Sequence, residues 1–191
     1  FFWAIGIPVY DCYGLTETVS QILYCGPDDA SHQVGTVGRP RNGRARVCDD
    51  DDQPLGSGQT GELHVTGDNL MSGYFGNEAA STEVLTPDGW LRTGDLATID
   101  ESGLVRIVGR KKSVIITGGI NIYPEEIDEE VRRLPEVRDA ATVGIEDRTW
   151  GERAVTVVEA AAGVDLDLGE VSQALTRVLA PEKRPHRSLE S

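Results

Sequence analysis

Residues 109–131 have the sequence GRKKSVIITGGINIYPEEIDEEV, and this stretch decides how the second half of the chain folds. Residues 113–117 are largely β-branched and predict a strand. Gly118 and Gly119 interrupt that strand, because glycine adopts backbone conformations that other residues avoid. Pro124 suits the first position of a helix, and the acidic residues after it complement the helix dipole. The stretch therefore predicts a strand, a break and a helix start.

Downstream of this stretch, the apolar pattern predicts a small α+β unit. Apolar residues at helical spacing continue the first helix as far as Leu134. Residues 137–145 and 153–160 predict two strands separated by a polar turn, and residues 168–179 predict a second amphipathic helix. The predicted order of elements is β-α-β-β-α.

The first half of the chain has a different pattern, rich in short strands and turns. Glu62, His64 and Thr66 alternate with Leu63 and Val65, which predicts a strand of a half-exposed antiparallel sheet. The other predicted elements are a buried strand at 5–9, strands at 44–47, 96–100 and 104–108, a helix at 78–85 and a loop at 26–43. The fold class is therefore predicted to be α+β, with a strand-rich, barrel-like part before the β-α-β-β-α domain.

The change of pattern predicts a domain boundary at residues 110–112. The expected domains are residues 1–109 and residues 110–191. Since no low-complexity linker separates them, a short hinge is expected rather than a flexible tether.

Composition narrows the range of partners and compartments. The 191 residues carry a formal net charge of −14, with a sequence pI near 4.5, which argues against broad attraction to nucleic acid or anionic lipid. No apolar stretch approaches the roughly 20 residues of a transmembrane helix. The three cysteines lack CxxC spacing, which is typical of a reducing compartment, so a cytoplasmic location is predicted.

Neither the histidines nor the acidic run at residues 49–52 predicts a metal site. The three histidines show no HxxxH or HExxH spacing. The four consecutive aspartates lack the alternate spacing and the glycine of an EF-hand loop, so a solvated turn is expected there.

Two short motifs in the first half carry groups that suit a nucleotide. Residues 13–17, YGLTE, offer a ring for a base, a hydroxyl for a phosphate and a carboxylate for Mg²⁺, although a loop with Thr16 capping a helix explains the same residues. Residues 92–95, RTGD, contain Asp95, whose two oxygens suit the two hydroxyls of a ribose. An aspartate in a turn explains that motif equally well.

The opening stretch contributes further candidates. Arg110 is placed to reach a ribose or phosphate, Lys112 lies in the expected hinge, and the Gly118-Gly119 pair lets a thin ligand pass close to the backbone. The alternative is two surface cations and a plain hairpin turn.

Taken in order, these motifs resemble the AMP-forming adenylating enzymes, a superfamily of acyl-CoA synthetases, adenylation domains of peptide synthetases and luciferases. The resemblance covers the chain from Val9 to Pro185. It is carried by YGLTE, GELHVTGDNLMSGYFGN, WLRTGD, GRKKSVIITGGINIYPEEID and WGERAVTVV.

The resemblance implies a role for each residue of the first motif. Asp11 is implied to contact the adenine amino group, and Tyr13 to stack on the adenine. Thr16 is implied to bind the α-phosphate and Glu17 to ligate Mg²⁺. Gly14 belongs to the same nucleotide-binding loop, near the acyl group.

For the later motifs, the resemblance implies that Asp95 and Arg110 hold the ribose. Lys112 matches the hinge about which the C-terminal domain rotates between adenylation and thioester formation. Gly118 and Gly119 match the loop that lines the pantetheine tunnel.

Two motifs of this superfamily are not recognised in the sequence: the Ser/Thr/Gly-rich phosphate loop, and PxTxxGK with its catalytic lysine. Lys183 precedes the expected position of that lysine and lacks its Gly-Lys context. The expectation is therefore a C-terminal portion that is truncated before the catalytic lysine and inactive alone.

The implied activity is that of an acyl-CoA synthetase. It makes an acyl-adenylate from a carboxylic acid, fatty or aryl, and MgATP, and then passes the acyl group to coenzyme A. The implied cofactors are ATP, Mg²⁺ and coenzyme A, with no nucleic acid and no transmembrane segment. The alternatives are an adenylation domain that loads a carrier protein and a non-catalytic nucleotide-binding module.

Overall fold

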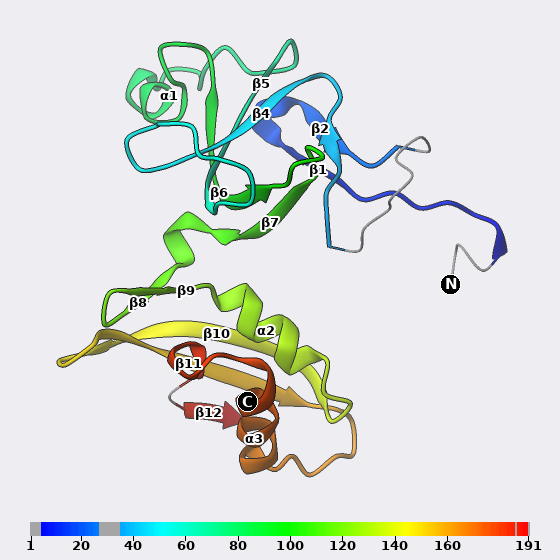
Figure 1. The fold of residues 1–191 in the computed structure, drawn as a ribbon, viewed down its shortest axis with the longest axis vertical. Helices are drawn as coiled ribbons and strands as arrows, with labels where there is room; N and C mark the ends of the chain where they lie inside the picture. Colours follow the sequence, from blue (N-terminus) through cyan, green and yellow to red (C-terminus); the bar gives the residue numbers. More distant parts are fainter. Residues whose placement is uncertain (1–4, 27–34, 186, 191) are drawn as a thin grey trace. The chain divides into compact units, whose positions relative to one another are not determined.

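The computed structural model of the chain describes residues 5–26, 35–185 and 187–190. His32, His186 and part of the predicted loop at 26–43 lie outside these residues. The chain divides into two compact units, Phe1–Val108 and Gly109–Ser191, which are described one after the other (Figure 1).

The first unit contains two open sheets. One has the strands β1 (Cys12–Leu15), β2 (Ser20–Tyr24) and β3 (Arg39–Pro40), in that order. The other has β4 (Gly43–Cys48), β5 (Gly61–Gly67), β6 (Leu91–Ile99) and β7 (Val105–Arg110), also in sequence order. Among the described residues neither sheet closes into a barrel, so the barrel-like part is a pair of open sheets.

The helix expected at 78–85 is α1 (Glu78–Val84). It begins at Asn77, whose side chain accepts a hydrogen bond of 3.0 Å from the Ala80 N–H. The core of the first unit consists of apolar side chains from β2 and from all four strands of the second sheet: Ile22, Leu23, Val47, Leu63, Val65, Leu91, Ala97 and Val105.

Two sequence predictions for the first unit are wrong. Residues 5–9 do not form a buried strand: Ile5, Ile7 and Val9 are each about half exposed, because no described strand pairs with this apolar run. The alternation in β5 does not produce a half-exposed sheet either, since Glu62 is 7% and His64 is 0% exposed. Polar side chains from other segments cover that face of β5, as described below.

The second unit contains a sheet in the order β10-β11-β8-β9, with β12 beside β11. Two helices share one apolar core with this sheet, which includes Ile127 and Val131 from one and Val171 and Leu175 from the other. The elements are β8 (Ile115–Thr117), β9 (Ile120–Ile122), α2 (Pro124–Arg132), β10 (Val137–Asp147), β11 (Gly151–Ala160), α3 (Leu168–Val178) and β12 (Arg187–Glu190).

The predicted β-α-β-β-α order is correct for the elements it contains, but β9 and β12 were missed. Strand β9 has only three residues and follows directly on the Gly118-Gly119 turn, so the predicted break is the turn of a β8–β9 hairpin. Among the described residues, none of the helices has the length and apolar character that crossing a bilayer requires.

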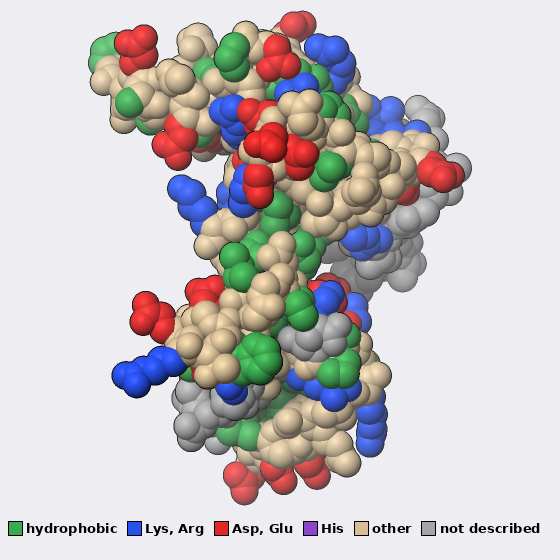
Figure 2. Space-filling view, turned by 60° about the vertical axis from the view of Figure 1, so that its left-hand side comes forward, with side chains coloured by type: hydrophobic (Ala, Val, Ile, Leu, Met, Phe, Trp, Pro, Cys, Tyr) green, Lys and Arg blue, Asp and Glu red, His purple; other side chains and the backbone are tan. Residues whose placement is uncertain are grey.

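Figure 2 shows acidic and basic side chains close together on the surface of the first unit.

Candidate functional site

The YGLTE motif forms a tight connection between two paired strands. Tyr13, Gly14 and Leu15 end β1, and Thr16 and Glu17 begin the short 3₁₀ helix η2 (Thr16–Thr18). Thr18 is the last residue of η2. Its hydroxyl accepts the Leu15 N–H at 2.9 Å and donates to the Ser20 carbonyl at 2.7 Å.

The residue whose hydroxyl bonds to the backbone at both ends of η2 is Thr18 and not Thr16. Thr16 is exposed, whereas Thr18 is fully buried. The N-cap position of η2 is Leu15, so the alternative in which Thr16 caps a helix is wrong, and Thr16 is an exposed residue of the connection.

The backbone of this connection requires unusual residues. A Cβ atom on Gly14 would lie 2.0 Å from the Ser20 carbonyl oxygen, so only glycine fits at the irregularity between β1 and β2. Val19 has a φ of 59°, which is disfavoured for a β-branched residue. Such strain is concentrated at functional sites in proteins, and here it occurs directly between η2 and β2.

A second segment of the first unit holds this connection in place. The Asn69 side-chain amide donates to the Thr18 carbonyl at 2.7 Å, and the Met71 N–H donates to the Glu17 carbonyl at 2.8 Å. The Tyr74 hydroxyl donates to Glu17 Oε1 at 2.7 Å. That hydrogen bond raises the pKa of Tyr74, because an ionised phenol would lose it beside a carboxylate.

The RTGD motif forms a bulge inside β6. Glu62 pairs with Leu96 and His64 pairs with Arg92, so residues 93–95 lie opposite the single residue between them on β5. Gly94 has a φ of 73° and donates its N–H to Glu62 Oε1 at 3.1 Å. Asp95 therefore lies in a strand bulge, and the alternative of an aspartate in a turn is wrong.

Hydrogen bonds within the bulge orient Asp95. The Thr93 hydroxyl donates to the Leu63 carbonyl at 2.8 Å and accepts the Asp95 N–H at 3.1 Å. The Asp95 residue is 4% exposed, and the Tyr13 hydroxyl donates to its Oδ2 at 2.5 Å. The structure thus brings together the predicted residues Tyr13 and Asp95.

The other predicted residues lie apart from this pair or in the second unit. Asp11 is exposed just before β1, and its carbonyl accepts the Cys25 N–H at 3.0 Å. Arg110 ends β7, and its N–H donates to Glu125 Oε1 at 3.3 Å. Lys112 is exposed in the short 3₁₀ helix η3 (Lys111–Ser113).

Gly118 and Gly119 form the turn of the β8–β9 hairpin, with φ values of 58° and 84°. The Gly118 N–H donates to the Trp150 carbonyl at 2.8 Å, and the Ile116 N–H donates to Glu152 Oε2 at 2.8 Å. The hairpin is therefore attached to the start of β11 by both backbone and side chain.

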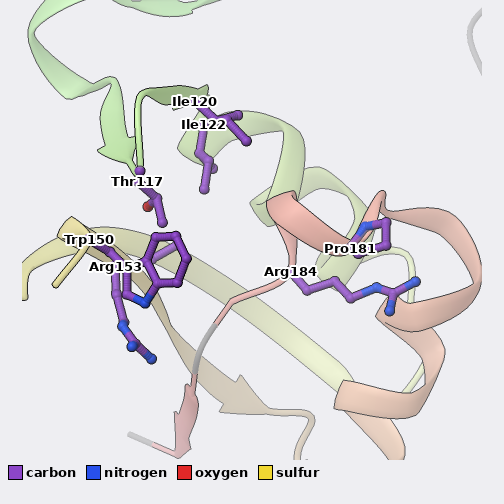
Figure 3. A pocket seen from close by; sticks show the side chains of 9 residues that line it. Thr117, Ile120, Ile122, Trp150, Arg153, Pro181 and Arg184 are labelled. Carbon is purple, nitrogen blue, oxygen red and sulfur yellow. The ribbon is translucent and has the colours of Figure 1, made fainter.

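A cavity of about 300 Å³ lies beside this hairpin (Figure 3). Figure 3 shows Trp150 near Thr117, with Pro181 and Arg184 farther along the lining. The lining combines apolar and basic side chains: Thr117, Gly118, Ile120, Ile122, Trp150, Arg153, Ala154, Pro181 and Arg184. The Gly118-Gly119 turn is thus a hairpin turn that also borders a cavity.

Sequence reasoning assigned no individual roles to Asn69, Tyr74, Glu62 or Trp150. The first three lie in GELHVTGDNLMSGYFGN, and Trp150 begins WGERAVTVV. Both stretches were recognised as motifs, so their polar and aromatic residues were the available signal.

His64 is a buried titratable group next to the bulge. Its Nε2 lies 3.7 Å from Asp52 Oδ1 and 4.0 Å from Glu62 Oε2, and Arg46 and Arg92 are also close enough to act on it. Burial lowers the pKa of His64 from its usual 6.5, and this outweighs the two carboxylates.

We predict that His64 makes the first unit sensitive to acid. The folded pKa of His64 lies below its unfolded pKa of about 6.5, so its contribution to the free energy of unfolding is fully present above that pH. The contribution is lost as the pH falls through the folded pKa, by at most about 1.4 kcal/mol per pH unit. Urea unfolding at several pH values checks this, with His64→Leu as the comparison. An equal pH dependence of both chains between about pH 7 and pH 5.5 would contradict it.

Comparison with known proteins agrees with the motif order. Residues 1–75 match the AMP-binding enzyme family, and residues 126–189 match the AMP-binding enzyme C-terminal domain. The chain is 41% identical over 181 residues to indoleacetate–CoA ligase of Aromatoleum aromaticum, covering 94% of this chain and 35% of the relative. It is 35% identical over 183 residues to 2-succinylbenzoate–CoA ligase of Enterococcus faecalis, covering 95% and 37%.

Solved structures of similar proteins have the same fold. ATP-bound MatB from Rhodopseudomonas palustris has a TM-score of 0.90 at 34% identity, over 97% of this chain and 37% of that one. MenE, the o-succinylbenzoate coenzyme A synthetase of Bacillus subtilis, in complex with ATP and magnesium has a TM-score of 0.89 at 31% identity, over 100% and 39%. The chain therefore spans little more than a third of the relatives that it matches, and it belongs to the family of AMP-binding enzymes.

Proposed function

We propose that this chain is part of an AMP-forming acid–CoA ligase. In such a reaction a carboxylate oxygen attacks the α-phosphorus of ATP and pyrophosphate leaves; the thiol of coenzyme A then attacks the acyl carbon and AMP leaves. The observation that carries the proposal is the meeting of Tyr13 with Asp95 beside the Thr16–Glu17 connection.

Most of the contacts to the adenosine would come from the first unit. Asp95 has two acceptor oxygens, and a ribose diol supplies two donors. The Tyr13 hydroxyl already donates to Oδ2, which places the edge of an aromatic ring next to the ribose position. The ring is then available for stacking on adenine. We assign Asp11 to the adenine amino group and Arg110 to the ribose.

The phosphates would be held at the Thr16–Glu17 connection. Thr16 is an exposed residue there, and its hydroxyl suits a phosphate oxygen. Mg²⁺ is commonly bound by one or two carboxylates together with substrate phosphates, and Glu17 supplies one carboxylate oriented by Tyr74. Since the described residues contain no cluster of three or more metal ligands, this donor set fits an ion that arrives with ATP. That ion supplies neutralisation of phosphate charge.

The second unit would serve thioester formation. The Gly118-Gly119 turn borders the cavity with Trp150, and a narrow chain such as pantetheine, in which two amides separate short methylene segments, suits a lining that combines apolar and basic side chains. In this proposal residues 1–109 belong to the large AMP-binding domain, and residues 110–191 form a mobile C-terminal domain that turns about Lys112.

The relatives support the choice of substrates. The A. aromaticum and E. faecalis relatives are named as CoA ligases, which favours coenzyme A over a carrier protein as the acyl acceptor. Indoleacetate and 2-succinylbenzoate are aromatic acids, so an aromatic acid is favoured over a fatty acid.

The three free cysteines agree with a cytoplasmic location.

A chimera tests this proposal. The matching third of the A. aromaticum ligase is replaced by this chain, and pyrophosphate exchange is measured with indoleacetate and ATP. We expect exchange that depends on Glu17, with a loss of roughly 10²- to 10³-fold in Glu17→Ala. A folded chimera without exchange, together with no AMP binding by the 191-residue chain, would refute the proposal.

A further inference from the structure

The acidic run at residues 49–52 forms an ordered turn after β4. Asp49 Oδ1 accepts the N–H groups of Asp51 at 3.0 Å and Gln53 at 2.9 Å, and the Asp49 N–H donates to the Gln53 carbonyl at 3.0 Å. Asp52 has a φ of 59°, in the left-handed region that few residues other than glycine, asparagine and aspartate adopt readily. The turn therefore gives Asp52 a defined direction.

The Asp52 side chain is not simply solvated, which corrects the sequence interpretation of this turn. Its Oδ1 accepts the Arg92 Nε–H at 2.9 Å, and its Oδ2 accepts a second, close hydrogen bond from Arg92 Nη2. Arg92 Nη1 also donates to the Glu83 carbonyl at 2.9 Å. A bidentate contact of this kind between a carboxylate and a guanidinium restricts the position and the orientation of the guanidinium. Its hydrogen bonds lower the pKa of Asp52.

Arg92 is the residue that precedes the bulge at residues 93–95. It pairs with His64 of β5, and His64 is buried against Asp52 on the same face. Within the bulge, the N–H of Gly94 donates to the Glu62 carboxylate. The Asp52 carboxylate thus fixes the Arg92 side chain just before the bulge, and the Glu62 carboxylate fixes the backbone N–H of Gly94 within it.

We propose that Asp52 is a positioning residue for nucleotide binding. Through Arg92 it holds the 93–95 bulge in the conformation that presents the Asp95 carboxylate to the ribose diol. The inference rests on the proposed function, because it takes the ligand of Asp95 to be a ribose. It adds a residue from outside the recognised motifs, forty positions before Arg92 in the chain.

Three variants separate positioning from folding. Asp52→Gly removes the carboxylate and relieves the left-handed backbone, so any loss of binding is not explained by backbone strain. Asp52→Asn keeps one acceptor oxygen and tolerates the same φ. Asp51→Asn removes one charge from the same turn at an exposed side chain and is the matched control.

The binding test compares AMP with 2′,3′-dideoxy-AMP, using calorimetry on the 191-residue chain at one salt concentration. We expect Asp52→Gly to weaken AMP binding about 2- to 30-fold, with dideoxy-AMP binding unchanged. Asp52→Asn should lie between Asp52→Gly and the unchanged chain, and Asp51→Asn should match the unchanged chain. Equal weakening of both nucleotides, or no weakening of AMP, would overturn the proposal.

A nucleotide-free measurement keeps the two proposals distinguishable. Amide hydrogen exchange by NMR should be faster at Gly94 and Asp95 in Asp52→Gly than in Asp51→Asn, while β2 amides remain unchanged. If the unchanged chain binds no AMP, the proposed function of the site fails. Unchanged exchange at Gly94 and Asp95 would refute the positioning role of Asp52 directly.

Discussion

An Asp95→Ala chain is expected to bind AMP roughly 10- to 100-fold more weakly than the unchanged chain. The carboxylate is buried and accepts a hydrogen bond from the Tyr13 hydroxyl, and the Thr93 hydroxyl fixes the Asp95 backbone by accepting its N–H, so little reorganisation is needed to accept the ribose hydroxyls. Calorimetric titration with AMP, in parallel with thermal unfolding, checks the prediction. A loss of binding without a comparable loss of folded protein is the expected pattern.

Tyr13→Phe is the matched control for Asp95→Ala. It keeps the ring and removes only the donor to Oδ2, so the Asp95 carboxylate that is proposed to accept the ribose hydroxyls stays in place. We expect its affinity for AMP to stay within about threefold of the unchanged chain. If Tyr13→Phe lost as much affinity as Asp95→Ala, the phenol and not the carboxylate would be the main ribose contact.

The second large effect is expected at the β8–β9 turn. In Gly118→Ala the new Cβ would lie 2.7 Å from Trp150 Cε3, at a φ of 58°. The clash and the left-handed backbone together should lower the free energy of unfolding by about 2–4 kcal/mol. Urea unfolding followed by NMR signals of the second unit measures this change.

Gly119→Ala provides the comparison at the neighbouring position. Gly119 also has a positive φ, of 84°, but a Cβ there would meet no atom within 4 Å. Only the backbone term of about 1 kcal/mol is therefore expected. Equal destabilisation by both substitutions would show that Trp150 does not restrict the turn. In the chimera, Gly118→Ala should reduce thioester formation more than pyrophosphate exchange.

Short-range signals predicted the fold class well, because they depend on residues close in sequence. Pro124 begins α2, and the Gly118-Gly119 break is a turn with two positive φ values. The family resemblance, which rested on local motifs, was confirmed by the comparisons with known proteins. Strand β9 was missed because three residues between a turn and a helix give no periodicity to detect.

Contacts between distant segments were beyond sequence reasoning. The Tyr13 hydroxyl and Asp95 are 82 positions apart, and their hydrogen bond depends on how two sheets are arranged. The burial of His64 depends on Asp52 and Arg92 covering one face of β5, which alternation within the strand does not reveal. The roles of individual site residues stay predictions that the experiments above address.

The distribution of thiols in the first unit has a practical consequence. Cys12 is exposed on β1, next to Tyr13, whereas Cys25 and Cys48 are buried. Burial raises the pKa of the Cys48 thiol, which disfavours the thiolate that reacts with electrophiles. A maleimide dye should therefore attach selectively at Cys12 without any engineered cysteine. It would place a fluorescent reporter one residue from the ring expected to meet adenine, so ligand arrival becomes visible as a change in emission.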